Sequence, residues 1–352
     1  MAIEEEKIVD QMKEFTKGIK AMQKEFGAGS LFVLGEDTRT KAEFIPIDSM
    51  KLSRIMGGGI PRGTFIEIFG WESSGKTTIS SYLVGQAQKA GYVCAYIDSE
   101  NAFNSDYAKV VGLNPDNLIF SQPDNAEQGL SIVESLVDNI PNLGIIVIDS
   151  IATLTPQKEI DGDMGDANMG LQARLLGQAF RKLVRKVKDK KVTVLMTNQV
   201  RHKIGVMYGS PDTTPGGNAP KFYSSIRLRI RKAEDIIEKN NLIGIKIHIK
   251  AIKNKVATPM REDIMELYFD AGFDVLAETI DFAVHYGLIK KGGAWFTIDT
   301  GEIFQGKSKV VEYYKNNVDD LIKLRDEVLT RMNENRREIN GNTDTIDKQN
   351  IY

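Results

Sequence analysis

The stretch GWESSGKTT, residues 70–78, constrains this chain more than any other feature of its sequence. It fits the spacing G-x-x-x-x-G-K-[ST] and stands between an apolar segment, TFIEIFG, and a helix-forming one, KTTISSYLVGQAQKA. Glycines in such a loop let backbone N–H groups turn toward a phosphate, and the start of the following helix adds a favourable dipole. Lys76 would then reach the β- and γ-phosphates, and the Thr77 hydroxyl would bind Mg²⁺. The predicted nucleotide contacts are Gly70, Trp71, Glu72, Ser73, Ser74, Gly75, Lys76, Thr77 and Thr78.

From about residue 64, apolar segments that read as strands alternate with helical ones. Nearly continuous apolar strands of this kind indicate a parallel sheet covered by helices on both faces. The pattern then changes, because SSIRLRIRK and LIGIKIHIKAIKNK alternate apolar and basic residues, as half-exposed antiparallel strands do. A smaller, partly helical region follows after about residue 272. The predicted fold class is therefore α/β, with a mostly parallel sheet between helices.

The N-terminal segment, residues 3–26, is predicted to form a helix with an apolar seam along one face. A single helix cannot bury such a seam by itself, so it packs either on the chain's own core or on a neighbouring subunit. The residues do not decide between the two. The seam comprises Ile8, Met12, Phe15, Ile19, Met22 and Phe26.

Composition excludes several classes of protein. The net charge of -2 argues against an evenly basic nucleic-acid protein, and 41% hydrophobic residues suffice for a core. The single cysteine, Cys94, excludes a disulfide within the chain and is expected to be a small buried hydrophobe. No run approaches the roughly 20 apolar residues of a membrane span. We expect a soluble, cytoplasmic protein without a membrane partner.

Three polar positions at predicted strand ends extend the nucleotide site. Asp149 closes the strand GIIVID and is expected to be the second Mg²⁺ anchor, acting through water. Hydrolysis also needs a group that orients the attacking water, for which Glu100 is the candidate and Asp98 its competitor. Gln199 ends VTVLMTNQ, either to contact the γ-phosphate or simply as a polar strand end.

Two connections, residues 159–170 and 200–220, are long, glycine-rich and without periodicity, which is typical of functional loops. Both follow strands of the predicted parallel sheet, so they should leave it at one edge. The first loop is acidic. A polyanion there would have to meet backbone N–H groups and Met164 or Met169, as apolar wedges between bases.

The helix predicted at 171–191 holds eight Lys or Arg and one Asp. Its basic stripe is either a solvated face or a ridge for phosphate groups, which Arg binds in bidentate fashion. The stripe comprises Arg174, Arg181, Arg185 and Lys188, opposite an apolar side with Leu175, Phe180, Leu183, Val184 and Val187. A further basic row, Arg227, Arg229 and Arg231, favours the phosphate ridge modestly.

Taken in order, these motifs resemble those of the RecA recombinases, bacterial-type ATPases of DNA strand exchange, over about residues 1–330. The resemblance rests on GWESSGKTT and on EFGAGS, QPDNAEQGL, IIVIDSIATLTPQKEIDGDMGD, MGLQARLLGQAFRKL, NQVRHKIGVMYGSPDTTPGGNAPKFYSSIRLRIR, KNKVATP and GAWF. It implies a RecA-type P-loop ATPase core with an N-terminal helix arm and a small α+β C-terminal domain. The implied boundaries are 1–35 for an oligomerisation helix and strand, 36–271 for the core, 272–335 for the C-terminal domain and 336–352 for a disordered tail.

The resemblance implies an ATP- and Mg²⁺-dependent recombinase that forms helical filaments on single-stranded DNA and pairs that strand with homologous duplex DNA in recombinational repair. Glu100 becomes the catalytic carboxylate, Lys76 a phosphate ligand, and Gln199 the sensor between γ-phosphate and second loop. Further implied nucleotide contacts are Tyr107 on adenine, Asp149 with Thr77 on Mg²⁺, and Lys253 and Lys255 on the ATP of the neighbouring subunit. The implied DNA contacts are Met169, Arg174, Arg181, Arg201, Lys203, Met207, Gly216 and Gly217. The implied filament interface is Lys221, Phe222 and the N-terminal helix, whose seam is thereby assigned to a neighbour.

Some positions depart from the family pattern. Asn104 stands where an adenine-facing Asp is frequent, Asn101 where a His is familiar, and Trp71 in place of a Pro. The tail lacks the acidic run thought to restrain duplex binding. The family also stimulates the self-cleavage of a repressor in the SOS response. No motif of this sequence indicates whether the chain has that activity.

Other classes share the phosphate loop. A ring-forming motor would unwind duplexes, and a P-loop kinase would need a lid with a catalytic arginine, for which the sequence has no evident segment. A nucleotide-gated regulator without strand exchange is a third alternative.

Overall fold

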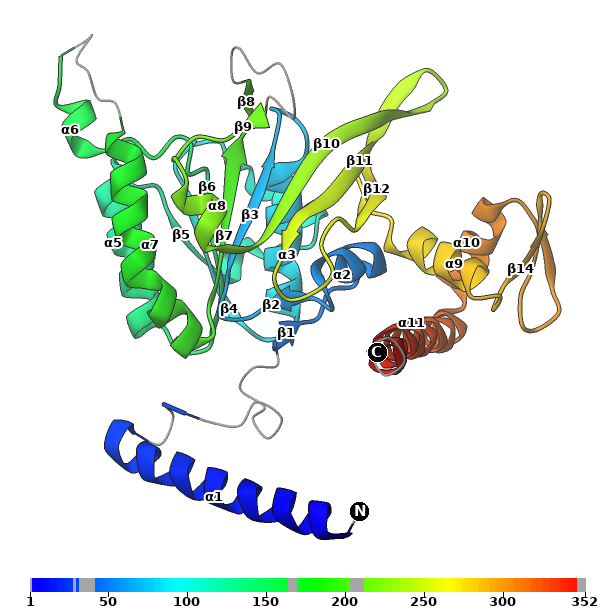
Figure 1. Ribbon diagram of the computed structural model, residues 1–352. Helices are drawn as coiled ribbons and strands as arrows, with labels where there is room; N and C mark the ends of the chain where they lie inside the picture. The colour runs from blue at the N-terminus through cyan, green and yellow to red at the C-terminus, as the bar shows by residue number, and fades with distance from the viewer. Residues whose placement is uncertain (1, 28–29, 32–41, 164–169, 203–211, 347–352) are drawn as a thin grey trace. The chain divides into compact units, whose positions relative to one another are not determined.

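The computed structural model describes the chain except for residues 1, 28–29, 32–41, 164–169, 203–211 and 347–352 (Figure 1). It divides into two units, Met1–Glu43 and Phe44–Tyr352. In the first unit, helix α1 (Ala2–Phe26) confirms the predicted N-terminal helix. The seam side chains Phe15, Met22 and Phe26 are exposed on it.

The second unit is built on a nine-stranded sheet that is parallel in one part and antiparallel in the other (Figure 1). The predicted parallel strands pair side by side, and the two basic segments form the predicted antiparallel pair, with buried and partly exposed residues alternating along the first half of β10. Across the sheet the strands are β13 (Gly272–Phe273), β12 (Glu262–Tyr268), β11 (Asn241–Asn254), β10 (Ser224–Glu238), β3 (Phe65–Gly70), β7 (Thr193–Gln199), β6 (Leu143–Asp149), β4 (Val93–Asp98) and β5 (Leu118–Ser121).

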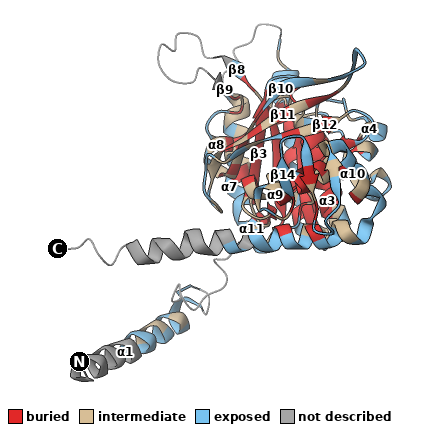
Figure 2. Cartoon of the chain, turned by 90° about the vertical axis from the view of Figure 1, so that its right-hand side faces the viewer, coloured by how far each residue is buried: buried red, intermediate tan, exposed pale blue. Residues whose placement is uncertain are grey.

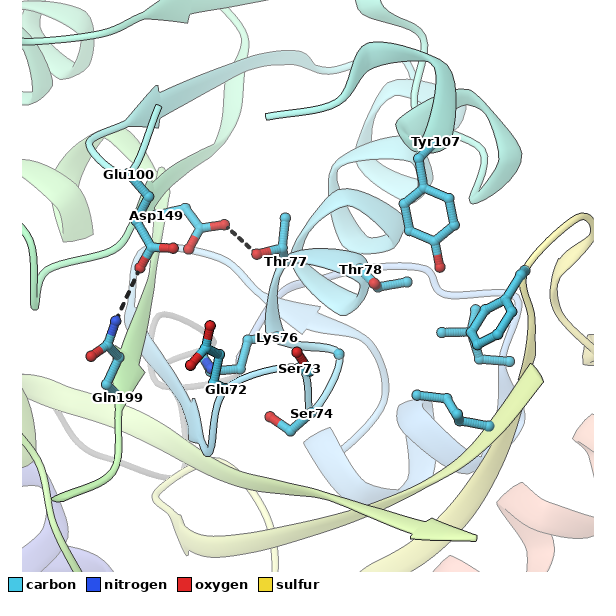
Figure 3. Close-up of a pocket in the computed structure, with 14 residues that line it drawn as sticks. Glu72, Ser73, Ser74, Lys76, Thr77, Thr78, Glu100, Tyr107, Asp149 and Gln199 are labelled. Atoms are coloured by element: carbon cyan, nitrogen blue, oxygen red, sulfur yellow. Dashed lines mark hydrogen bonds between the residues drawn. The ribbon is translucent and has the colours of Figure 1, made fainter. Parts of the chain in front are cut away.

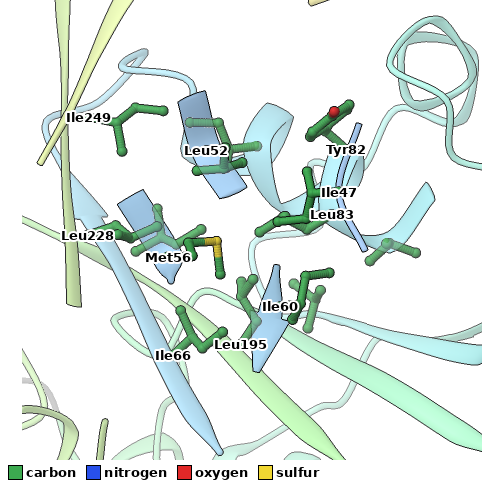
Figure 4. Close-up of a cluster of buried hydrophobic side chains, with 14 of the residues drawn as sticks. Ile47, Leu52, Met56, Ile60, Ile66, Tyr82, Leu83, Leu195, Leu228 and Ile249 are labelled. Carbon is green, nitrogen blue, oxygen red and sulfur yellow. The ribbon is translucent and has the colours of Figure 1, made fainter. Parts of the chain in front are cut away.

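Helices cover both faces of this sheet, as the sequence predicts. On one face α2 (Met50–Met56) and α3 (Lys76–Lys89) pack on it through a cluster that includes Leu52, Tyr82 and Leu83 (Figure 4). On the other, α5 (Ala126–Asn139) and α7 (Leu171–Lys190) bury residues such as Val133 and Phe180. Figure 2 shows how burial concentrates in the sheet between them. Cys94 is fully buried in β4, as expected, and burial raises the pKa of its thiol to about 12.

The sheet order places the predicted site residues at one edge. Because β3, β7, β6 and β4 run parallel and adjacent, their carboxyl ends meet, and with them the phosphate loop, Asp149, Gln199 and the segment after Asp98. The loops 159–170 and 200–220 leave this same edge from β6 and β7, as predicted. Short elements within the connections are β1 (Phe44–Ile45), β2 (Ile60–Pro61), α4 (Ser105–Val110), the 3₁₀ turn Pro115–Asn117, α6 (Gln157–Ile160), β8 (Arg201–His202), β9 (Asp212–Thr213) and α8 (Ala219–Tyr223).

The C-terminal part forms its own small core of helices and a three-stranded sheet. Its elements are α9 (Val275–His285), β14 (Lys290–Gly292), β15 (Trp295–Thr297), β16 (Ile303–Gln305), α10 (Lys307–Asn316) and α11 (Val318–Ile346). The structure differs from the predicted disordered tail over residues 336–346, where α11 continues. Arg and Glu early in this polar stretch are good helix formers that extend an existing helix at little cost. Within the described part of the chain, no helix combines the length and apolarity needed to cross a membrane.

Candidate nucleotide-binding site

The phosphate loop joins β3 to α3 through a left-handed residue. Gly75 caps the helix at φ 94°, a conformation that favours glycine, and a Cβ there would also lie 2.6 Å from Ile247 Cδ1. Ser74 Oγ donates to Trp71 O at 2.7 Å, and Lys76 Nζ donates to the same carbonyl at 2.8 Å. Burial lowers the pKa of Lys76, which Asp149 and Glu100 oppose. The loop thus places a lysine ammonium at the N-terminus of α3, a position that favours phosphate binding.

A pocket of about 390 Å³ opens over this loop (Figure 3). It gathers most predicted nucleotide residues: Glu72, Ser73, Ser74, Gly75, Lys76, Thr77, Thr78, Glu100, Tyr107, Asp149 and Gln199. Ile245, Leu267 and Phe269, from β11, β12 and the residue after β12, line it too. Sequence reasoning missed these three because alternating strands carry no motif. They reach the pocket because β10 pairs with β3, β11 pairs with β10, and β12 pairs with β11.

Asp149 is held at the floor of the pocket by three hydroxyl groups. Thr77 Oγ1 donates to its Oδ2 at 2.8 Å and Tyr96 Oη to the same oxygen at 2.7 Å, while Thr197 Oγ1 donates to Oδ1. The two predicted Mg²⁺ residues, Thr77 and Asp149, are therefore in direct contact (Figure 3). Burial, followed by the Asp149 charge, raises the pKa of Tyr96 well above its usual value. Tyr96 was not singled out from the sequence.

The two candidate carboxylates, Asp98 and Glu100, differ sharply in their surroundings. Asp98 is 2% exposed and accepts hydrogen bonds from the backbone of Glu100, Ala102 and Phe103 and from Gln122 Nε2. Asp98 thus stabilises the backbone of residues 100–103. Glu100 is exposed and lines the pocket.

Two side chains orient the Glu100 carboxylate. Ser150 Oγ donates to Oε1 at 2.6 Å. Gln199 Nε2 lies 3.5 Å from the same oxygen (Figure 3). Gln199 thus connects this carboxylate to the end of β7, from which the second loop starts. Asn101, where the family has His, adopts φ 55°, a conformation that Asn tolerates.

Tyr107 is presented to the pocket by the short helix α4. Asn104 caps this helix, and its Oδ1 accepts from the backbone N–H groups of Asp106 and Tyr107 at 3.0 and 2.9 Å. The side-chain oxygen of Asn104 is therefore engaged in holding the helix that carries the ring.

Lys221 and Phe222, assigned to the filament interface, and Lys253 and Lys255, assigned to the neighbour's ATP, do not line the pocket. Lys253 Nζ donates to the carbonyls of Lys221 and Phe222 at 2.6 and 3.2 Å, at the end of α8. Burial lowers the pKa of Lys253, and the nearby Lys255 and Arg227 add to this. The ring of Phe222 is 71% exposed.

Residues assigned to DNA follow the loops and α7. Arg174, Arg181, Arg185 and Lys188 are exposed on α7, with Leu176, Phe180, Leu183 and Val187 buried opposite. Val184, expected on the apolar side, is 39% exposed, because it lies at the margin of that face. Gly216 and Gly217 have positive φ and approach α7 so closely that a Cβ would contact Leu176 or Ala173 at 2.8 Å. Arg201 is exposed on β8, and Met164, Met169, Lys203 and Met207 lie outside the described residues.

The basic row on β10 is not uniform, and the expectation that it favours a phosphate ridge is wrong for Arg227. Arg227 pairs with the fully buried Glu67, and its guanidinium lies 4.7 Å from the centre of the Phe69 ring. This arginine neutralises the Glu67 carboxylate. Without it, the buried charge would have no partner and would strongly destabilise the fold.

A phosphate loop between strand and helix, beside an acid that ends a parallel strand, defines a P-loop nucleoside triphosphatase. Comparison with known proteins gives the family. The family model of the RecA N-terminal domain matches residues 13–274, and that of the RecA C-terminal domain matches residues 277–333.

Curated relatives agree over nearly the whole chain. The RecA protein of Thermus aquaticus is 44% identical over 92% of this chain and 95% of its own length. Those of Caulobacter vibrioides and Bacillus licheniformis are 44% and 42% identical over 88% and 91% of this chain, and over 87% and 92% of their own. The chain belongs to the RecA family. It is accordingly an ATP-dependent DNA recombinase with DNA-dependent ATPase activity.

Proposed function

We propose that the pocket binds ATP together with Mg²⁺, with Lys76 on the phosphates and Thr77 and Asp149 on the cation. The observation that carries this proposal is the 2.8 Å hydrogen bond between Thr77 and Asp149 beside the phosphate loop. A hydroxyl and one carboxylate suit Mg²⁺, which keeps several waters and phosphate oxygens as ligands. Among the described residues no group of three or more His, Cys, Asp or Glu forms a metal cage. The bound cation would neutralise charge on the phosphates.

Glu100 is proposed to orient the water that attacks the γ-phosphate. It faces the pocket, and Ser150 and Gln199 hold one of its oxygens. Among the described hydrogen bonds none engages the other oxygen, which can accept from a water molecule. Tyr107 is proposed to stack on the base, with Ile245, Leu267 and Phe269 as further apolar contacts. Gln199 would transmit the presence of the γ-phosphate to loop 200–220.

The proposed partners are single-stranded DNA, duplex DNA and further copies of the chain. The exposed basic stripe of α7 and the two loops supply the DNA surface. This surface would bind the phosphates of the strand and leave its bases free for pairing. The exposed seam side chains Phe15, Met22 and Phe26 of α1 and the exposed Phe222 supply apolar contacts to a neighbour. Lys253 and Lys255 would reach the neighbour's ATP. A head-to-tail interface that does not close yields a helical filament.

We assign these roles to residues 1–35 (assembly), 36–271 (ATPase core with both DNA loops) and 272–335 (C-terminal domain), followed by the tail at 336–352. The family models meet between residues 274 and 277, close to the second boundary.

ATP-dependent pairing of a labelled single strand with a homologous duplex tests the proposal, with a heterologous duplex as control. We expect product only with homology and only with Mg²⁺. Lys76→Ala should abolish both hydrolysis and pairing, whereas unchanged ATP turnover in that variant would contradict the site. DNA-stimulated hydrolysis without pairing, or duplex unwinding by closed rings, would instead identify a regulator or motor on the same core.

A further inference from the structure

The carboxylate of Asp149 accepts hydrogen bonds from three hydroxyl groups. Thr77 and Tyr96 both donate to Oδ2, at 2.8 and 2.7 Å, and Thr197 donates to Oδ1. Each carboxylate oxygen offers about two acceptor positions. Within the hydrogen bonds that the structure describes, Oδ2 is therefore saturated, and the remaining acceptor position is on Oδ1.

The sheet itself aims the Tyr96 hydroxyl at this oxygen. Tyr96 on β4 pairs in register with Val147 on β6, and Asp149 follows Val147 by two residues, on the same face of the sheet. The hydroxyl thus reaches along the strand direction to the carboxylate. The Tyr96 ring is fully buried and is held by Phe103, with ring centres 4.8 Å apart. Burial and this ring contact hold the side chain in place.

We propose that Tyr96 is a positioning residue for the magnesium–nucleotide site: its hydroxyl locks the Asp149 carboxylate in the orientation in which Oδ2 binds Thr77 and Oδ1 alone is free to accept from a cation-bound water. This inference rests on the proposed function of Thr77 and Asp149. Without the Tyr96 hydroxyl, Oδ2 regains an acceptor position, and the carboxylate can turn away from Thr77. Groups that hold a metal-binding carboxylate in this way commonly set metal affinity.

Tyr96→Phe tests the proposal, because it removes only the hydroxyl. The measurement is the affinity for a fluorescent ATP analogue by titration, once with Mg²⁺ and once with EDTA. We expect affinity in Mg²⁺ to fall about tenfold and affinity in EDTA to stay unchanged. Tyr82→Phe is the matched control, since Tyr82 is buried in the same cluster and its hydroxyl accepts from the Ser49 N–H at 2.9 Å, away from Asp149. It should leave both affinities unchanged.

The outcomes separate the inference from the proposed function. A wild-type protein whose affinity for the analogue does not depend on Mg²⁺ would refute the proposed function. With a Mg²⁺-dependent wild type, equal losses in Mg²⁺ and EDTA, or no loss in Tyr96→Phe, would overturn the role of Tyr96. Phe103→Leu provides a second variant if Tyr96→Phe is poorly folded. It keeps the hydroxyl but loosens the ring, and we expect a smaller loss confined to Mg²⁺, whereas no loss would count against the proposal.

Discussion

The buried carboxyl group of Glu278 should make the stability of this protein fall as the pH rises toward neutrality. Glu278 lies on α9, is 3% exposed, and accepts hydrogen bonds from Ser49 Oγ at 2.8 Å and from the Lys51 N–H at 3.4 Å, at the N-cap and in the first turn of α2. Burial raises its pKa from the ordinary 4.5 to about 7, although these hydrogen bonds oppose the shift. The group joins the C-terminal part to the core, so its ionisation acts on that contact.

The sign and size of the effect follow from proton linkage. Between pH 4.5 and about 7 the folded chain holds a proton that the unfolded chain has released, so this group contributes stability that is present below pH 4.5 and lost as the pH rises through about 7. At about 1.4 kcal/mol per pKa unit, the loss is on the order of 3 kcal/mol. For a domain of this size it corresponds to a melting temperature lower by roughly 5 °C.

Glu278→Gln removes the titration while it keeps the size and the hydrogen-bonding oxygen of the side chain. We expect the variant to lose this part of the pH dependence, so that its stability relative to the wild type increases from pH 5 to pH 8. Urea unfolding followed by circular dichroism at several pH values measures the difference. Glu312→Gln, on an exposed position of α10, controls for the loss of one charge. Parallel pH profiles for the wild type and Glu278→Gln would refute the reasoning.

Three further substitutions test the proposed roles. Glu100→Gln should lower the rate of DNA-stimulated ATP hydrolysis at least about 100-fold, with nucleotide affinity retained, because only the group that orients water is lost; a normal rate by phosphate release would exclude Glu100. Arg181→Ala should weaken single-stranded DNA binding and reduce the slope of log affinity against log salt by about 0.7, as expected for one lost phosphate contact; an unchanged slope in fluorescence anisotropy would leave the stripe a solvated face. Phe222→Ala should shorten filaments seen by electron microscopy without altering the melting temperature, since the ring is exposed, and filaments of normal length would remove it from the interface.

Much of this architecture was predictable because the signals are local. The phosphate loop, the apolar strand before it and the helix after it are neighbours in sequence, so spacing alone indicates a phosphate site between β3 and α3. Alternating apolar strands and helices likewise predicted the parallel sheet and the edge at which Asp149 and Gln199 meet the loop. The family motifs added the activity, which the comparisons support over most of the chain.

Other features depend on contacts between segments far apart in the chain. Spacing leaves Asp98 as a competitor of Glu100, and only the fold shows the Asp98 carboxylate bound to backbone amides and the Glu100 carboxylate in the pocket. Asn104 reads as an altered base contact, yet its oxygen caps a helix. Arg227 reads as part of a basic surface, yet it neutralises buried Glu67.

The hydroxyl of Tyr96 lies 2.7 Å from an Asp149 oxygen because β4 and β6 are adjacent and in register. Periodicity determines which residues form a strand and which are buried, since it reflects the repeat of one segment. Which buried polar group meets which partner depends on strand order and register, and these are settled only when distant segments pack together.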